Sequence, residues 1–234
     1  MTDRDEAFRM LDTFASVGAT HFDLTHINIE GEKRGFRPQQ TLPQLKNSLP
    51  RLFPGATARQ NNIIVRPHSD IAQLIQLDDL KIDGIDKVKD VAFLTLQTSP
   101  GNHQAWVAVS GLKSGEETQE FARRLRKGAG ADPSASGATR VAGTANYKRK
   151  YEPGFPTVKI VDAAPGRIVT REQLESLGLV SPAEPAATSV IPIRSRRKHS
   201  ATEGERTWPD YERCVAGAPP SKEGDGSDRS MADF

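Results

Sequence analysis

The sequence predicts an α+β (mixed α/β) domain that is followed by a tail without a hydrophobic core. Apolar residues recur at helical spacing in residues 4–17 and 114–127. Apolar runs typical of strands occur at residues 21–29, 63–67, 71–77, 91–96 and 103–109. From residue 181 onwards this spacing stops, and Pro, Gly and charged residues take over. We therefore expect one domain at residues 1–180 and a disordered linker at residues 181–234.

The composition is that of a chain with one domain and an appendage. The chain has 234 residues, and 36% of them are hydrophobic, which is low for a chain that packs over its full length. Its 32 basic and 30 acidic residues nearly cancel, so only local patches can indicate nucleic acid. Cys214 is the single cysteine, which excludes an internal disulfide and a zinc ribbon. With no apolar run of the roughly 18 residues that span a membrane and no signal-peptide pattern, we expect a cytoplasmic protein.

The first elements are predicted to pack the domain. A helix at residues 4–17 ends at Gly18, and residues 21–29 alternate as a strand before a turn at 30–33. His21 and His26 are five residues apart on a two-residue period, so they face opposite sides and do not form a joint metal site.

Two prolines are expected to end the next elements. A short helix begins at Thr41 and should end before Pro50, because proline cannot continue the hydrogen-bond ladder. The strand at residues 63–67 should stop at Pro67. Arg66, next to this end, is either a phosphate contact or an ordinary surface residue.

Two adjacent acids, Asp78 and Asp79, follow the strand at residues 71–77. Carboxylates are the ligands that Mg²⁺ and Mn²⁺ prefer, but a solvated turn with two acids is a common alternative. Side chains on a regular strand alternate between its faces. Both acids can therefore bind one metal only if the strand ends or bulges between them.

A hairpin and a basic segment supply polar groups. The strands at 91–96 and 103–109 are joined by a turn at 98–102, whose hydroxyl, amide and backbone groups either contact phosphate or sugar or merely form the turn. Ser114 should cap a helix that runs to Lys127, with Glu117 completing a capping box. The densest basic cluster of the domain follows at residues 140–150 and suits phosphate.

The last predicted elements are short. We expect a strand at residues 158–161 and a helix that is capped by Thr170 and ends at Gly178. In the tail, the basic run at 194–198 is a solvated stretch or a nonspecific nucleic-acid contact. Residues 228–234 are typical of a helix cap and first turn.

Four strings in this order resemble the RepB-like DNA primase domain of plasmids and mobile elements, a zinc-lacking branch of the archaeo-eukaryotic primase superfamily. They are LDDL (77–80), TSPGNHQAW (98–106), GAGAD (128–132) and RVAGTANYK (140–148). The resemblance is strongest over residues 61–161. It implies an RRM-like sheet core, antiparallel or mixed, with flanking helices.

The resemblance implies primer synthesis on single-stranded DNA, in which nucleoside triphosphates are joined with release of pyrophosphate. Asp78, Asp79 and Asp132 match the family's catalytic carboxylates, which hold two divalent ions, Mg²⁺ or Mn²⁺. The residues expected to contact nucleotide or DNA are Ser99, Asn102, His103, Arg140, Asn146, Lys148 and Arg66.

One motif departs from the superfamily pattern. The superfamily pairs a Ser with a His two residues on, whereas Ser99 and His103 are four apart, so His103 does not simply take that role. Two other functions remain open: a catalytically inactive single-stranded-DNA-binding replication accessory module, and a metal-dependent nuclease. We expect a monomer that does not contact a membrane and that acts with the helicase or initiator of the same element.

Overall fold

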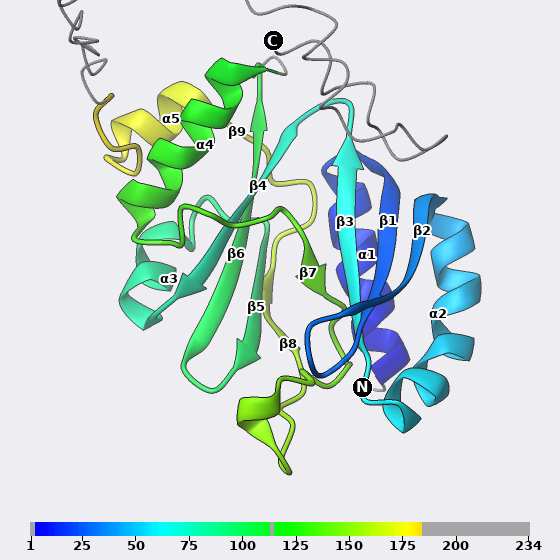
Figure 1. The fold of residues 1–234 in the computed structure, drawn as a ribbon. Helices are drawn as coiled ribbons and strands as arrows, with labels where there is room; N and C mark the ends of the chain where they lie inside the picture. Colours follow the sequence, from blue (N-terminus) through cyan, green and yellow to red (C-terminus); the bar gives the residue numbers. More distant parts are fainter. Residues whose placement is uncertain (1–2, 113–114, 184–234) are drawn as a thin grey trace, which may run out of the picture. The chain divides into compact units, whose positions relative to one another are not determined.

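Nine β-strands form two sheets in the described part of the chain, residues 3–112 and 115–183 of a computed structural model (Figure 1). The first sheet has the strand order β2-β1-β3-β7 and is antiparallel. Its strands are β1 (Ala19–Ile27), β2 (Lys33–Thr41), β3 (Asn62–Ser69) and β7 (Thr139–Arg140). The second sheet has the antiparallel order β4-β6-β5-β8, and the short β9 pairs in parallel with β6. Its strands are β4 (Gln73–Leu80), β5 (Leu94–Ser99), β6 (Asn102–Ser110), β8 (Lys159–Ala163) and β9 (Val169–Thr170).

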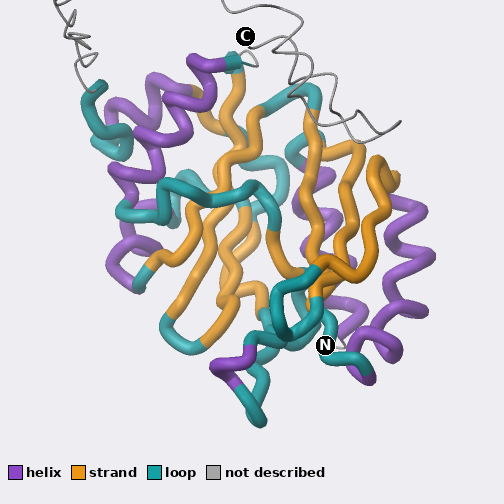
Figure 2. The backbone as a smooth tube through the Cα atoms, in the orientation of Figure 1, coloured by secondary structure: helices purple, strands orange, loops and turns teal. Residues whose placement is uncertain are grey.

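Helices cover one face of the first sheet and both faces of the second (Figure 2). Residues of α1 and α2 pack with β1 and β3, and α1 also reaches β5 and β6. Residues of α3, α4 and α5 pack on the other face of the second sheet. The helices are α1 (Asp3–Ser16), α2 (Leu42–Ala58), α3 (Ile82–Val88), α4 (Glu116–Ala129) and α5 (Arg171–Ser176), with a 3₁₀ turn, η1, at Arg149–Tyr151. The predicted α+β class with antiparallel and mixed sheets is confirmed, and no described helix has the length and apolar character needed to cross a membrane.

Phe14 of α1 is the centre of the core that joins the two sheets. Its ring meets Phe22 of β1 edge-on at 6.4 Å between centroids, Phe93 before β5 at 5.5 Å, and Trp106 of β6 at 5.0 Å. All four side chains are fully buried. Because edge-to-face aromatic pairs add to the hydrophobic gain of burial, α1 fixes the distance between the sheets.

The central strands of the second sheet, β5 and β6, are buried on both faces, which explains their continuous apolar runs. In β6, Trp106 and Ala108 belong to the core around α1, while Ala105, Val107 and Val109 belong to the core under α3–α5. A strand covered on both sides needs apolar residues at successive positions rather than at alternate ones.

Most elements lie within a few residues of their predicted positions, but the strand predicted at residues 91–96 runs from Leu94 to Ser99, and the two proline boundaries are wrong. Helix α2 continues through Pro50 and Pro54 to Ala58, because its buried Leu45, Leu49 and Ala56 anchor it to the core and outweigh the lost backbone bonds.

Strand β3 likewise passes through Pro67 to Ser69. Pro67 pairs with Phe22 of β1, whereas β7 pairs only with Ile64 and Val65 of β3. Pro67 therefore occupies a local sheet edge, where a missing N–H is tolerated.

Five elements were not predicted: β2, α3, η1 and the two-residue strands β7 and β9. Strand β2 is exposed along most of its length and lacks apolar alternation, and α3 is a single short helix after the acids. The helix cap at Ser114, Cys214, the basic run at 194–198, the turn at 228–234 and all but the first residues of the predicted linker lie outside the described residues.

We predict that Phe14→Ala lowers the free energy of unfolding by about 3–5 kcal/mol, because it leaves a cavity between the sheets. Urea denaturation followed by circular dichroism measures this change. Phe36→Ala is the matched control, since Phe36 is 48% exposed, and it should change stability by about 0.5 kcal/mol or less. Equal effects of the two substitutions would contradict the assignment of Phe14 to the centre of the core.

Candidate active site

A β-bulge places Asp78 and Asp79 at the surface of β4. Leu77 pairs with Ala105 of β6 and Leu80 pairs with His103, so two residues of β4 oppose the single Gln104. Asp79 takes up the extra length with a left-handed backbone, φ 56°. Leu77 and Leu80 are fully buried on either side, whereas Asp78 is half-buried and Asp79 exposed. The bulge that two neighbouring carboxylates need in order to act together is therefore present.

The carboxylate of Asp78 is held by two donors. Its Oδ1 accepts hydrogen bonds from the backbone N–H of Asp79 and from Nε2 of Gln104, both at 2.8 Å. Gln104 is buried, and its Oε1 accepts a 2.6 Å hydrogen bond from the Thr139 hydroxyl. Because the amide is engaged at both ends, its orientation is fixed and it presents an N–H to Asp78.

A second buried glutamine, Gln76, holds the segment before β7 against the second sheet. Its Nε2 donates to the carbonyl oxygen of Ala138 at 2.7 Å, and its Oε1 accepts from the Gly137 N–H at 2.8 Å. Together, Gln76 and Gln104 connect β4 and β6 to the segment that leads into the first sheet.

Asp132 lies beside Asp78 through a backbone contact. The N–H of Asp132 donates to the carbonyl oxygen of Asp78 at 2.9 Å. The carboxylate of Asp132 accepts bonds from the Ser134 hydroxyl at 2.7 Å and the Ser134 N–H at 2.8 Å. These bonds lower the pKa of Asp132 below its ordinary value, so the carboxylate is charged at neutral pH.

The donor set suits a hard divalent cation by its chemistry, because all three acids offer carboxylate oxygens on adjacent backbone segments. Among residues 3–112 and 115–183, however, no group of three or more His, Cys, Asp or Glu side chains is gathered in a position to hold a metal. Asp132 is directed to Ser134, and Asp79 lies 3.6 Å from the Lys81 amine. The three-carboxylate metal site therefore stays a prediction.

Arg140 supplies a half-buried positive charge near these acids. Its Nε donates to Oδ1 of Asn62 at 2.7 Å. Burial lowers the pKa of Arg140, while the nearby Asp78 and Tyr151 act in the opposite direction. The charges of Asp78 and Arg140 therefore interact. Because arginine keeps its charge in proteins, this positive charge is permanent.

Asn62 on β3 positions Arg140. Besides the bond from Arg140, its Oδ1 accepts one from the Tyr147 N–H at 2.9 Å. Its Nδ2 donates to the carbonyl oxygens of Tyr147 at 2.9 Å and Ile27 at 3.3 Å. The buried amide thus joins β1, β3 and the segment after β7.

The turn between β5 and β6 carries a second polar group. Asn102 donates to the hydroxyl of Ser99 at 3.1 Å and accepts a bond from the amine of Lys81. Tyr151 hydrogen-bonds with Ser99. Burial raises the pKa of Tyr151, but the bonds to Ser99 and Lys150 and the charges of Lys150 and Lys148 outweigh it, so the pKa is below its ordinary value.

The other predicted site residues lie as follows. Asn146 donates to the Thr98 carbonyl oxygen at 2.8 Å. Its own Oδ1, and Nδ1 of His103, are buried without a hydrogen-bond partner in the described part of the chain. Lys148 is exposed, and Arg66 is exposed on β3, where its charge acts on Asp23 rather than on the three acids.

Sequence reasoning missed Gln76, Gln104, Thr139, Asn62 and Tyr151. Gln104 lies within the TSPGNHQAW string and Tyr151 directly follows the basic cluster, so the sequence contained a reason to consider both as site residues. No sequence pattern marks Asn62 as a site residue, because its role depends on Arg140, which is 78 positions away in the chain.

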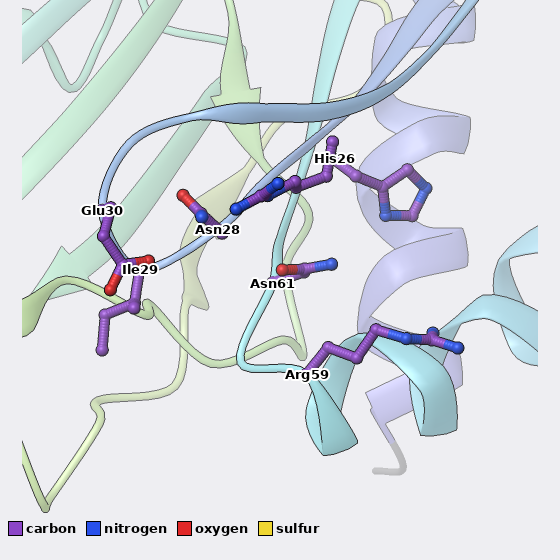
Figure 3. A pocket seen from close by; sticks show the side chains of 7 residues that line it. His26, Asn28, Ile29, Glu30, Arg59 and Asn61 are labelled. Atoms are coloured by element: carbon purple, nitrogen blue, oxygen red, sulfur yellow. The ribbon is translucent and has the colours of Figure 1, made fainter.

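A cavity of about 450 Å³ lies apart from this site, at the connection of β1 and β2 (Figure 3). It is lined by His26, Asn28, Ile29, Glu30, Arg34, Arg59 and Asn61. Several of these polar groups are already engaged: Glu30 pairs with Arg149 at 2.7 Å, and Glu32 binds both Arg34 and Asn28. The cavity contains none of the predicted site residues.

Residues 37–172, more than half of the chain, match the RepB DNA-primase N-terminal domain, so the chain belongs to this family. A DNA primase of Acidithiobacillus ferrooxidans is 27% identical over 205 residues, which are 76% of this chain and 55% of that protein. Mobilization protein A of Escherichia coli is 34% identical over 101 residues, which are 40% of this chain and 14% of that protein. The chain thus spans about half or less of the length of these relatives.

Two solved structures share the fold. The crystal structure of primase RepB′ has a TM-score of 0.62 and 24% identity, over 75% of this chain and 62% of that one. The catalytic domain of primase RepB′ in complex with initiator DNA has a TM-score of 0.59 and 26% identity, over 73% of this chain and 94% of that one. The resemblance inferred from the four sequence strings is therefore confirmed, and the chain contains a DNA-primase domain of the RepB type.

We predict that Asp79→Val destabilises the protein by about 1–2 kcal/mol relative to Asp79→Asn, because a β-branched residue resists the left-handed backbone of the bulge. Both substitutions remove the charge, so the comparison isolates the backbone conformation. Urea denaturation of both variants measures the difference. Equal stability would mean that the bulge does not need a left-handed residue.

The buried amide of Asn62 gives a second prediction. Asn62→Ala should cost roughly 2–4 kcal/mol, since it leaves the Arg140 and Tyr147 donors without their acceptor. Gln119→Ala, at an exposed position of α4, is the matched control and should change stability by about 0.5 kcal/mol or less. Thermal and urea unfolding measure both variants, and an Asn62→Ala variant as stable as Gln119→Ala would contradict the role of Asn62 in holding Arg140.

Proposed function

We propose that residues 1–180 form the catalytic domain of a DNA primase that acts in the replication or transfer of a plasmid or mobile element. The domain would join nucleotides on single-stranded DNA and release pyrophosphate. The observation that carries this proposal is the bulge that brings Asp78 and Asp79 to the surface of β4 beside Asp132, with the half-buried cation of Arg140 near Asp78. Membership of the RepB primase family and the likeness to a primase domain in complex with initiator DNA support it.

The carboxylates of Asp78, Asp79 and Asp132 would hold Mg²⁺ or Mn²⁺. When bound, two such ions activate the attacking 3′-hydroxyl and neutralise the triphosphate. The protein's own contribution is to orient these ligands. Gln104 fixes the Asp78 carboxylate, and the bulge keeps Asp79 on the same open edge of the sheet.

The reaction transfers a nucleotidyl group. The 3′-oxygen forms a bond to the α-phosphorus of the incoming nucleotide, and the bond from that phosphorus to the bridging oxygen breaks, so that pyrophosphate leaves with the electron pair. The hydroxyl proton passes to solvent. Arg140 and Lys148 would offset the negative charge that grows on the leaving group, because fixed cations stabilise such a charge without reorganisation.

The remaining polar groups would position the nucleotide. The unpartnered Oδ1 of Asn146 can accept a hydrogen bond, and Nδ1 of His103 can accept or donate one according to its tautomer. Ser99 and Asn102 are linked to Tyr151 and Lys81 at the end of the β5–β6 hairpin. We propose that these groups contact the sugar and phosphates of the incoming nucleotide.

A primer-synthesis assay tests the function. The 234-residue protein is incubated with single-stranded template, labelled nucleotides and Mg²⁺ or Mn²⁺, and the labelled products are separated by size. Asp78→Asn, Asp79→Asn and Asp132→Asn should each lower synthesis by at least about 100-fold, because loss of a metal ligand removes several kcal/mol of transition-state stabilisation at about 1.4 kcal/mol per tenfold. Asp86→Asn is the matched control, an exposed acid on α3.

Two outcomes would overturn the proposal. If the wild-type protein binds single-stranded DNA but makes no product with either metal, it is an accessory binding module. If the labelled template is shortened instead of copied, the carboxylates position water and the protein is a nuclease.

A further inference from the structure

One row of side chains crosses the first sheet from the candidate active site to the outer edge of the sheet. Arg140 of β7 pairs with Ile64 of β3, Ile64 pairs with Thr25 of β1, and Thr25 pairs with Phe36 of β2. Directly paired residues of neighbouring strands project from the same face of a sheet. At about 4.8 Å between strands, Arg140 and Phe36 are roughly 14 Å apart across three strand spacings.

This row is on the face that the helices leave open. The neighbouring side chains of β1 and β3 point to the core around α1 and α2, and they are Phe22, Leu24, Ile63 and Val65. The row alternates with them and therefore projects away from α1, which lies behind β1 and β3 in Figure 1. Thr25 and Ile64, between the two ends of the row, are half-buried, so part of each side chain is accessible on this face.

Phe36 is an exposed aromatic ring on an edge strand. It is 48% exposed, and the Lys33 amine lies 3.8 Å from the centre of its ring. Burial in the fold does not require this side chain, because β2 faces solvent along most of its length. A ring with a cation over it provides a stacking surface and a phosphate contact at one place.

The charges on this face favour an anionic partner. Lys33, Arg66 and Arg140 are cations on it, and Asp23 is an acid beside Arg66. The Asp23 carboxylate is already engaged, since it accepts bonds from the Gln39 N–H at 3.0 Å and from His68 at 2.9 Å. The face therefore offers positive charge at both ends of the row.

We propose that this face is a template platform that binds single-stranded DNA and leads it to the candidate active site. The template platform consists of Phe36, Thr25 and Ile64, with Lys33 and Arg66 beside them, and it ends at Arg140 of the candidate active site. The proposal rests on the proposed primase function, because only a template needs to run continuously into that site. A single strand fits better than a duplex, since its bases are free to stack on Phe36, and the row has room for about four bases at their 3.4 Å spacing.

Fluorescence anisotropy with a labelled 15-nucleotide single strand tests the platform. Phe36→Ala should raise Kd by about 5- to 150-fold, the effect of losing one aromatic stacking contact, and Phe36→Tyr should restore binding. Lys33→Gln should weaken binding and reduce the slope of log K against log salt by about 0.7, the value for one phosphate contact on a single strand. The matched controls are Leu177→Ala, which removes a side chain of a residue 59% exposed, and Lys89→Gln, which removes an exposed cation after α3.

Primer synthesis separates the platform from the proposed function. Phe36→Ala should raise the template KM and leave kcat unchanged, whereas Asp78→Asn should abolish synthesis and leave single-strand binding unchanged. If Phe36→Ala and Lys33→Gln bind single strands as tightly as the controls do, the template platform is contradicted. It is also contradicted if both variants lose as much affinity for a blunt duplex as for a single strand. If the wild type makes no primer and Phe36→Ala still loses single-strand binding, the platform stands and the primase proposal fails.

Discussion

The extra residue in β4 is the constraint on which the candidate active site depends. A regular strand would put Asp78 and Asp79 on opposite faces, and one of them would then lie in the core. The pairing of Leu77 with Ala105 and of Leu80 with His103 prevents this by fixing both ends of the bulge. The buried leucines keep the register, so apolar packing determines where the two carboxylates emerge.

Buried amides then connect this bulge to the first sheet. Gln104 links Asp78 to Thr139, and Asn62 links Arg140 to Tyr147. A buried amide with all of its groups engaged permits one arrangement, while a misplaced one leaves a donor or acceptor unsatisfied. The network therefore fixes the position of the acids on the second sheet relative to the cation on the first.

The strings that carry the family resemblance were sufficient to predict the fold class and the carboxylates of interest. Helix α1, the core strands and the capping box at Thr170 were predictable because their patterns are local, with spacing along the chain matching spacing in space. The ends of α2 and β3 were not. Proline normally ends a helix or a strand. Helix α2 continues through Pro50 because Leu45 and Leu49 pack in the core, and β3 continues through Pro67 because that residue lies at a local sheet edge. Strand β2 has no apolar alternation, because only its pairing with β1 makes it a strand.

The sequence by itself determined the class of domain and its family, because these are encoded in short contiguous strings, and the same strings predict Asp78, Asp79 and Asp132 as the catalytic acids. The tertiary structure alone decided which residues support them. Asn62 meets Arg140 across 78 positions, and Phe36 shares a row with Arg140 through three strand pairings. Such relations follow from sheet order and register, and these are set by the burial of side chains on the opposite face.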